Sequence, residues 1–194
     1  MIKLNDYPIF QRHFSNLRET SKDGPKDNPV YMTQSTREAV AFDEVKKEYV
    51  SGLGLSDNPK SNDALFDDGR GCLVFVEFKN GFMNKAEQFS VRKKNYDSVL
   101  MFADITSTRI SETRKNMKYI LVYNKEKNYT NPDKESEKKT TVQESASFDD
   151  LAKMVIGYAD DEYIHFGLRM FKNYCFKEVH TYTEEEFKEY LSTL

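Results

Sequence analysis

The clearest strand pattern in the chain lies at residues 72–80, where a continuous run of apolar side chains gives way to two charges. Side chains on a strand alternate between its two faces, so the odd-numbered residues from Leu73 to Lys79 share one face. Both faces begin apolar, which predicts a strand covered on each side. Glu77 and Lys79 end this strand, and since buried unpaired charges are costly, they need a partner or a function.

A second strand is predicted just upstream, at residues 61–66, because the intervening residues 67–71 are rich in aspartate and glycine. A hairpin between the two strands would bring Asp63 beside Glu77. Two carboxylates would then converge with the ammonium group of Lys79. Carboxylate oxygens are the ligands that Mg²⁺ prefers, usually with water and substrate phosphate completing its shell.

Residues 35–50 are predicted to form a helix that packs on this sheet. Ser35 and Glu38 have the spacing of a capping box, and Glu38 also begins a helical stripe that continues with three apolar residues, Phe42, Val45 and Tyr49. Glu38 is therefore either a capping residue or an acid directed at the sheet, and both roles are compatible.

A long helix is predicted from Asn84 to about residue 105, with an inner stripe formed by Phe89, Tyr96, Leu100 and Ala103. Lys85 and Arg92 fall near the start of this stripe and Gln88 borders it. These side chains either contact phosphates of a nucleic acid, or extend their charged ends to water.

Basic residues exceed acidic residues between positions 85 and 118, although the whole chain has a net charge of −3. The excess includes Lys93 and follows the predicted carboxylate site directly, where a phosphate backbone would lie. A solvated helix face would explain the same charges.

In the rest of the chain, the sequence pattern predicts a short helix at residues 11–19, a strand at 117–123 reached by an α/β crossover, and a polar insertion at 125–147. A short helix at 148–158, strands at 163–171 and 174–182, and a helix capped by Thr183 are predicted to follow.

The length and composition predict one domain, residues 1–194, with a C-terminal extension at 148–194. No apolar run approaches a membrane span, so no membrane partner is expected. Cys72 and Cys175 lie in apolar surroundings, which favours buried thiols in a reducing, cytoplasmic location.

Asp63, followed by Glu77-Phe78-Lys79 on the next strand and then a long helix, resembles the PD-(D/E)XK nuclease superfamily over about residues 35–124. Asn62, not proline, precedes Asp63, and many members of the superfamily lack that proline. The resemblance implies an α/β protein with a mixed (α+β) sheet. It would have a restriction-endonuclease-like core whose central sheet is flanked by helices, with C-terminal strands and a helix.

The resemblance also implies a metal-dependent nuclease, most simply a DNA endonuclease, with DNA favoured over RNA. Asp63 and Glu77 would hold Mg²⁺ or Mn²⁺ with the backbone carbonyl of Phe78, Glu38 would be the acid of the first helix, and Lys79 would be catalytic. Lys85, Gln88, Arg92 and Lys93 would contact nucleic acid. The resemblance is compatible with a homodimer, since most relatives that cut both strands of DNA are dimers, but the sequence displays no dimer interface.

Two alternatives come from other functional classes. One is a catalytically inactive nuclease fold that serves as a binding module. The other is a protein-interaction or immunity-type protein whose acidic C-terminal half binds a basic partner.

Overall fold

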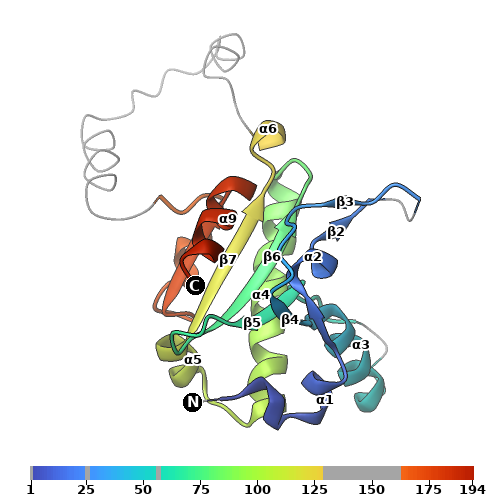
Figure 1. The fold of residues 1–194 in the computed structure, drawn as a ribbon. Helices are drawn as coiled ribbons and strands as arrows, with labels where there is room; N and C mark the ends of the chain where they lie inside the picture. The colour runs from blue at the N-terminus through green and yellow to red at the C-terminus, as the bar shows by residue number, and fades with distance from the viewer. Residues whose placement is uncertain (1, 25–26, 56–57, 129–162) are drawn as a thin grey trace.

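A six-stranded mixed sheet forms the centre of the computed structural model, which describes residues 2–24, 27–55, 58–128 and 163–194 (Figure 1). In the order in which they lie side by side, its strands are β1 (Phe14–Asn16), β4 (Glu38–Ala41), β5 (Ala64–Asp67), β6 (Leu73–Lys79), β7 (Met117–Tyr123) and β8 (Glu178–Tyr182). Pairing is antiparallel from β1 to β6 and parallel from β6 to β8. The prediction of an α/β protein with a mixed central sheet flanked by helices is confirmed.

Helices cover both faces of this sheet. One face is covered by η1 (Leu4–Asp6), α1 (Pro8–Gln11), α3 (Phe42–Leu53), α4 (Lys85–Thr106), α5 (Ile110–Asn116) and η2 (Leu168–Phe171). The other face is covered by α2 (Leu17–Thr20) and α9 (Glu184–Ser192), and Figure 1 shows α4 and α9 on opposite sides. A two-stranded sheet of β2 (Lys22–Asp23) and β3 (Val30–Tyr31) and the short α6 (Lys125–Asn128) complete the described elements.

The predicted hairpin of β5 and β6 is confirmed. Ala64 pairs with Val76 and Asp67 pairs with Leu73. In the turn, Asp67 accepts a hydrogen bond from the Gly69 amide, and Gly69 has a φ of +71°, a conformation that glycine adopts without steric cost. The alternation along β6 is also as predicted, since Phe75 packs on the α4 side and Val76 on the α9 side.

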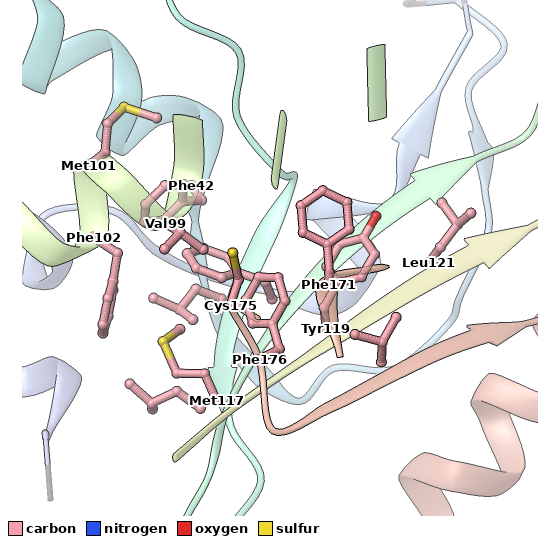
Figure 2. Close-up of a cluster of buried hydrophobic side chains, with 14 of the residues drawn as sticks. Phe42, Val99, Met101, Phe102, Met117, Tyr119, Leu121, Phe171, Cys175 and Phe176 are labelled. Carbon is pink, nitrogen blue, oxygen red and sulfur yellow. The ribbon is translucent and has the colours of Figure 1, made fainter. Parts of the chain in front are cut away.

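Aromatic side chains form much of the larger core cluster, which lies between the sheet and α4 (Figure 2). Phe75 is at its centre and makes edge-to-face contacts with Phe42, Phe102 and Phe176 at ring-centroid distances of 4.8, 6.0 and 6.4 Å. Offset and edge contacts of this kind add to the free energy gained by burying the rings.

The prediction of a helix over residues 35–50 is wrong at its beginning. Residues 38–41 form strand β4, and the helix starts at Phe42. Ser35 accepts a hydrogen bond from the amide of Arg37 and does not cap a helix. β4 pairs with β1 on one side and β5 on the other, and these backbone hydrogen bonds outweigh the local capping signal. The predicted contact face of Phe42 and Val45 is confirmed, because both are fully buried.

The predicted inner stripe of α4 is also wrong, although Asn84 caps this helix as predicted. Phe89 and Leu100 are 70% and 63% exposed. The buried stripe instead contains Val91, Val99 and Phe102 together with two polar residues, Asn95 and Ser98. Polar side chains occupy part of the buried face of α4, so the apolar periodicity of its sequence does not indicate which face is buried.

The ends of the chain differ from prediction as well. Residues 11–19 contain the end of α1, strand β1 and the start of α2 instead of one helix. Residues 163–171 form turns and the 3₁₀ helix η2, and only residues 178–182 of the second predicted strand are extended in the sheet. The capping box at Thr183 is confirmed. The predicted helix at 148–158, and the predicted insertion beyond residue 128, lie outside the described residues.

Both cysteines are buried free thiols, as expected. Among the helices described, none combines the length and apolar character needed to cross a bilayer.

Replacing Phe75 by alanine is expected to lower the free energy of unfolding by about 3–5 kcal/mol, because it leaves a cavity among three other rings. Phe89→Ala removes the same side chain from an exposed position of α4 and should change stability by less than about 0.5 kcal/mol. Urea unfolding of both variants measures the difference. Equal losses of unfolding free energy in the two variants would contradict a rotation of α4 that exposes Phe89.

Candidate active site

Asp63 and Glu77 lie side by side on the face of the sheet that α4 covers. Asp63 directly precedes β5, and its amide donates to the carbonyl of Val76, which places its side chain next to that of Glu77. Asp63 Oδ2 accepts a hydrogen bond of 2.7 Å from the Phe78 amide. The side chains are 16% and 0% exposed, so the sheet and helix hold two carboxylates almost out of contact with water.

Two lysines supply positive charge to this pair. Lys94 Nζ, from α4, lies 2.7 and 2.9 Å from the two oxygens of Glu77 and 3.3 Å from Asp63 Oδ1. Lys79 Nζ lies 3.7 Å from Glu77 Oε1 and donates a 2.9 Å hydrogen bond to Glu87 Oε2. Burial of a carboxylate pair is tolerated only with such compensation.

Polar contacts between α4 and the segment before β5 hold this arrangement in place. The amide of Asn62 donates to Ser98 Oγ at 2.8 Å, and Asn62 Nδ2 donates to Asn95 Oδ1 at 3.3 Å. All three residues are buried, so these hydrogen bonds are protected from competition with water. They set the position of α4 against the residue that precedes Asp63, and therefore the position of Lys94.

The charges in the cluster alter one another's protonation. Burial and the adjacent Asp63 carboxylate raise the pKa of Glu77 to about 8, although Lys94 opposes the shift. Burial also raises the pKa of Asp63, against the Lys94 ammonium and the Phe78 amide. Burial lowers the pKa of Lys94, but the Glu77 and Asp63 carboxylates outweigh it and the net shift is upward. Strong perturbation of several neighbouring groups is typical of functional sites.

Glu38, the expected acid of the first helix, does not join this cluster. It is an exposed residue of β4 and lines a hollow together with Asp67. Asp67 ends β5, whereas Asp63 precedes that strand, so Glu38 lies toward the opposite end. The reason is the strand at residues 38–41, which carries Glu38 away from the start of α3.

Three of the four residues expected to contact nucleic acid make contacts within the protein. Gln88 donates to the Met83 carbonyl, and Arg92 donates to the Phe166 carbonyl at 3.3 Å. Lys85 is exposed. Lys93, whose side chain is 45% exposed, pairs with Asp97, whose side chain is 15% exposed. Lys85 and Lys93 are therefore the better placed of the four for contact with a phosphate backbone.

Three residues of the site were not identified from the sequence: Lys94, Glu87 and Asp43. Lys94 and Glu87 lie on the helical stripe at positions 87, 91, 94 and 98, which would have indicated them if the stripe had been centred on Val91. Asp43, in the first turn of α3, acts electrostatically on Asp63 and Lys94 and accepts a hydrogen bond from Ser61. It is the acid that the first helix does bring toward the cluster.

The carboxylate pair fits a hard divalent cation as a partial set of ligands. Across the described residues, no three histidine, cysteine or acidic side chains are grouped closely enough to hold a metal ion. Mg²⁺, however, is commonly held by one or two carboxylates, with water and substrate phosphate as its other ligands. Asp63 and Glu77 already share one cation, the Lys94 ammonium, which is the observation that supports this fit.

Comparisons of this chain with protein-family models, with curated proteins and with solved structures found no match. The interpretation of the site therefore depends on its own geometry.

The raised pKa of Glu77 predicts a specific pH dependence of stability. The pKa of Glu77 is about 8 in the folded protein and near 4.5 in the unfolded chain, so the folded state binds the Glu77 proton more tightly. The stabilisation by this proton is complete below about pH 4.5 and is lost as the pH rises through 8. Glu77→Gln removes this loss. As the pH is raised from 5 to 9, the free energy of unfolding of the variant should increase relative to that of the wild type by on the order of 3–5 kcal/mol.

The matched control is Glu87→Gln. The hydrogen bond from Lys79 lowers the pKa of Glu87 below its usual value of 4.5, so the ionisation of Glu87 changes far less between pH 5 and pH 9 than that of Glu77. This control should show no such gain between pH 5 and 9 by chemical denaturation. If the unfolding free energies of the wild type and Glu77→Gln depended equally on pH, the raised pKa of Glu77 would be contradicted.

Proposed function

We propose that the protein is a metal-dependent nuclease that hydrolyses phosphodiester bonds, with DNA as the favoured substrate. The observation that carries this proposal is the convergence of Asp63, Glu77 and Lys79 where the β5–β6 hairpin meets α4. The arrangement agrees with the PD-(D/E)XK pattern expected from the sequence.

A restriction-endonuclease-like core over about residues 35–124 is part of the proposal. Its support is the order of elements around the site. β4, β5 and β6 are successive antiparallel neighbours, and α4 then crosses to β7, which is parallel to β6. The carboxylate pair lies on the hairpin, and the crossover helix covers it.

In the proposed mechanism, Mg²⁺ or Mn²⁺ would lower the pKa of a bound water and stabilise negative charge on the phosphate. Asp63 and Glu77 would hold the ion, with the Phe78 carbonyl as a further ligand. The Phe78 amide orients Asp63 by its hydrogen bond to Oδ2. Lys79 is held by Glu87 beside Glu77, where its ammonium would stabilise charge that develops in the transition state.

Substrate would approach along the exposed side of α4. Lys85 and Lys93 are available there to contact phosphates, which position a nucleic acid without reading its sequence. Lys60 is a further basic residue on this side, because its ammonium contacts Ser90 and acts electrostatically on Glu87.

A binding module without catalytic activity is the second candidate function. It is favoured by one observation: Lys94 and the Phe78 amide satisfy the carboxylate pair without any metal ion. Such a protein would retain the site as a structural ion cluster.

Substitution of the three central residues tests the proposal. Asp63→Asn, Glu77→Gln and Lys79→Met should each lower Mg²⁺- or Mn²⁺-dependent cleavage of single- or double-stranded DNA by about 100-fold or more. Calorimetry should show metal binding lost in the two carboxylate variants and retained in Lys79→Met, because the lysine is not a ligand.

Glu38→Gln is the control, since it removes an acid that lies away from the cluster, and it should cleave as the wild type does. Metal binding without cleavage of DNA or RNA would favour the binding module. Absence of metal binding in the wild type would refute the proposed enzyme.

A further inference from the structure

Every oxygen of the carboxylate pair already has a partner within the chain. Lys94 Nζ contacts both oxygens of Glu77 and Oδ1 of Asp63. The amide of Phe78 donates to the remaining oxygen, Asp63 Oδ2. A metal ion held by these carboxylates would therefore have to replace contacts that exist without it.

We propose that the Lys94 ammonium occupies the cation position of the Asp63–Glu77 pair, and that a divalent ion binds only after Lys94 has left it. The inference rests on the proposed function and concerns the regulation of that site. The site then has two states, one closed by Lys94 and one open to metal.

The two cations compete for the same carboxylate oxygens. Mg²⁺ binds oxygen at about 2.0–2.1 Å. An ion at that distance from either oxygen of Glu77 would lie within a few ångströms of Lys94 Nζ, which is 2.7 and 2.9 Å from the same oxygens. The side chains are 17% and 0% exposed, so little water screens the repulsion between the two positive charges.

Lys94 is able to leave the pair. Its ammonium is carried on a flexible four-carbon stem at an intermediate level of exposure. Asp43, whose side chain is 46% exposed, attracts the Lys94 charge and offers a second anionic neighbour near solvent. Lys79 is a less suitable competitor, because it lies farther from Glu77 and is hydrogen-bonded to Glu87.

Mn²⁺ titration by calorimetry tests the inference. The apparent affinity of a ligand falls with the fraction of protein in the competent state, so removing the competing ammonium should strengthen binding. Lys94→Met should bind Mn²⁺ about tenfold more tightly than the wild type or better. Lys94→Arg, which keeps a positive charge at this position, should not gain affinity.

Lys93→Met is the matched control. It removes the same charge from the neighbouring residue, whose ammonium pairs with Asp97 and not with the carboxylate cluster. Its affinity for Mn²⁺ should stay within about twofold of the wild type, because the Lys93 side chain is 45% exposed, so solvent screens its charge from the carboxylate pair.

Two outcomes overturn the inference in distinguishable ways. If the wild type binds Mn²⁺ and Lys94→Met binds it equally or less tightly, the competition by Lys94 is refuted while the metal site of the proposed function stands. If neither protein binds Mn²⁺, the proposed function fails together with the inference.

Acylation of lysines followed by mass spectrometry measures the release of Lys94 in the wild-type protein, so it decides the question even if Lys94→Met does not fold. Saturating Mn²⁺ should increase the labelling of Lys94 several-fold and leave the labelling of Lys93 unchanged. Labelling of Lys94 that stays constant or falls would overturn the inference.

Discussion

The burial of two adjacent carboxylates is the constraint on which the rest of this structure depends. Asp63 and Glu77 lie on a sheet face that is otherwise packed with aromatic and aliphatic side chains. Such a pair is stable only with a positive charge and hydrogen bonds close by. The Lys94 ammonium and the Phe78 amide supply them. The helix that carries Lys94 must therefore cross the sheet at this place and in this rotation.

The buried face of α4 is consequently divided by function. Val91, Val99 and Phe102 pack into the hydrophobic core, while Asn95 and Ser98 hydrogen-bond the segment that leads to Asp63. The apolar contacts supply most of the stabilisation, and the polar contacts specify one position of the helix. A site that depends on distances near 3 Å needs the polar contacts, which fix the helix position, as well as the apolar contacts, which supply stability.

The segments whose secondary structure differs from prediction share one cause. Residues 38–41 carry a local helical signal, but they pair with β1 and β5, which are far from them in sequence or separated by a whole helix. β8 likewise pairs with β7 in parallel across a long connection, and the residues before it form turns. Pairing with distant strands decides such segments, and a local pattern contains no information about it.

The sequence by itself determined the β5–β6 hairpin and the convergence of Asp63, Glu77 and Lys79, because strand alternation and turn chemistry are local properties. Only the tertiary structure decided the rotation of α4, the arrival of Lys94 and the position of Glu38. A helix presents side chains in all directions, and the face that becomes buried depends on what it packs against. Here the buried face includes an asparagine, a serine and a lysine, which hydrophobic periodicity assigns to solvent.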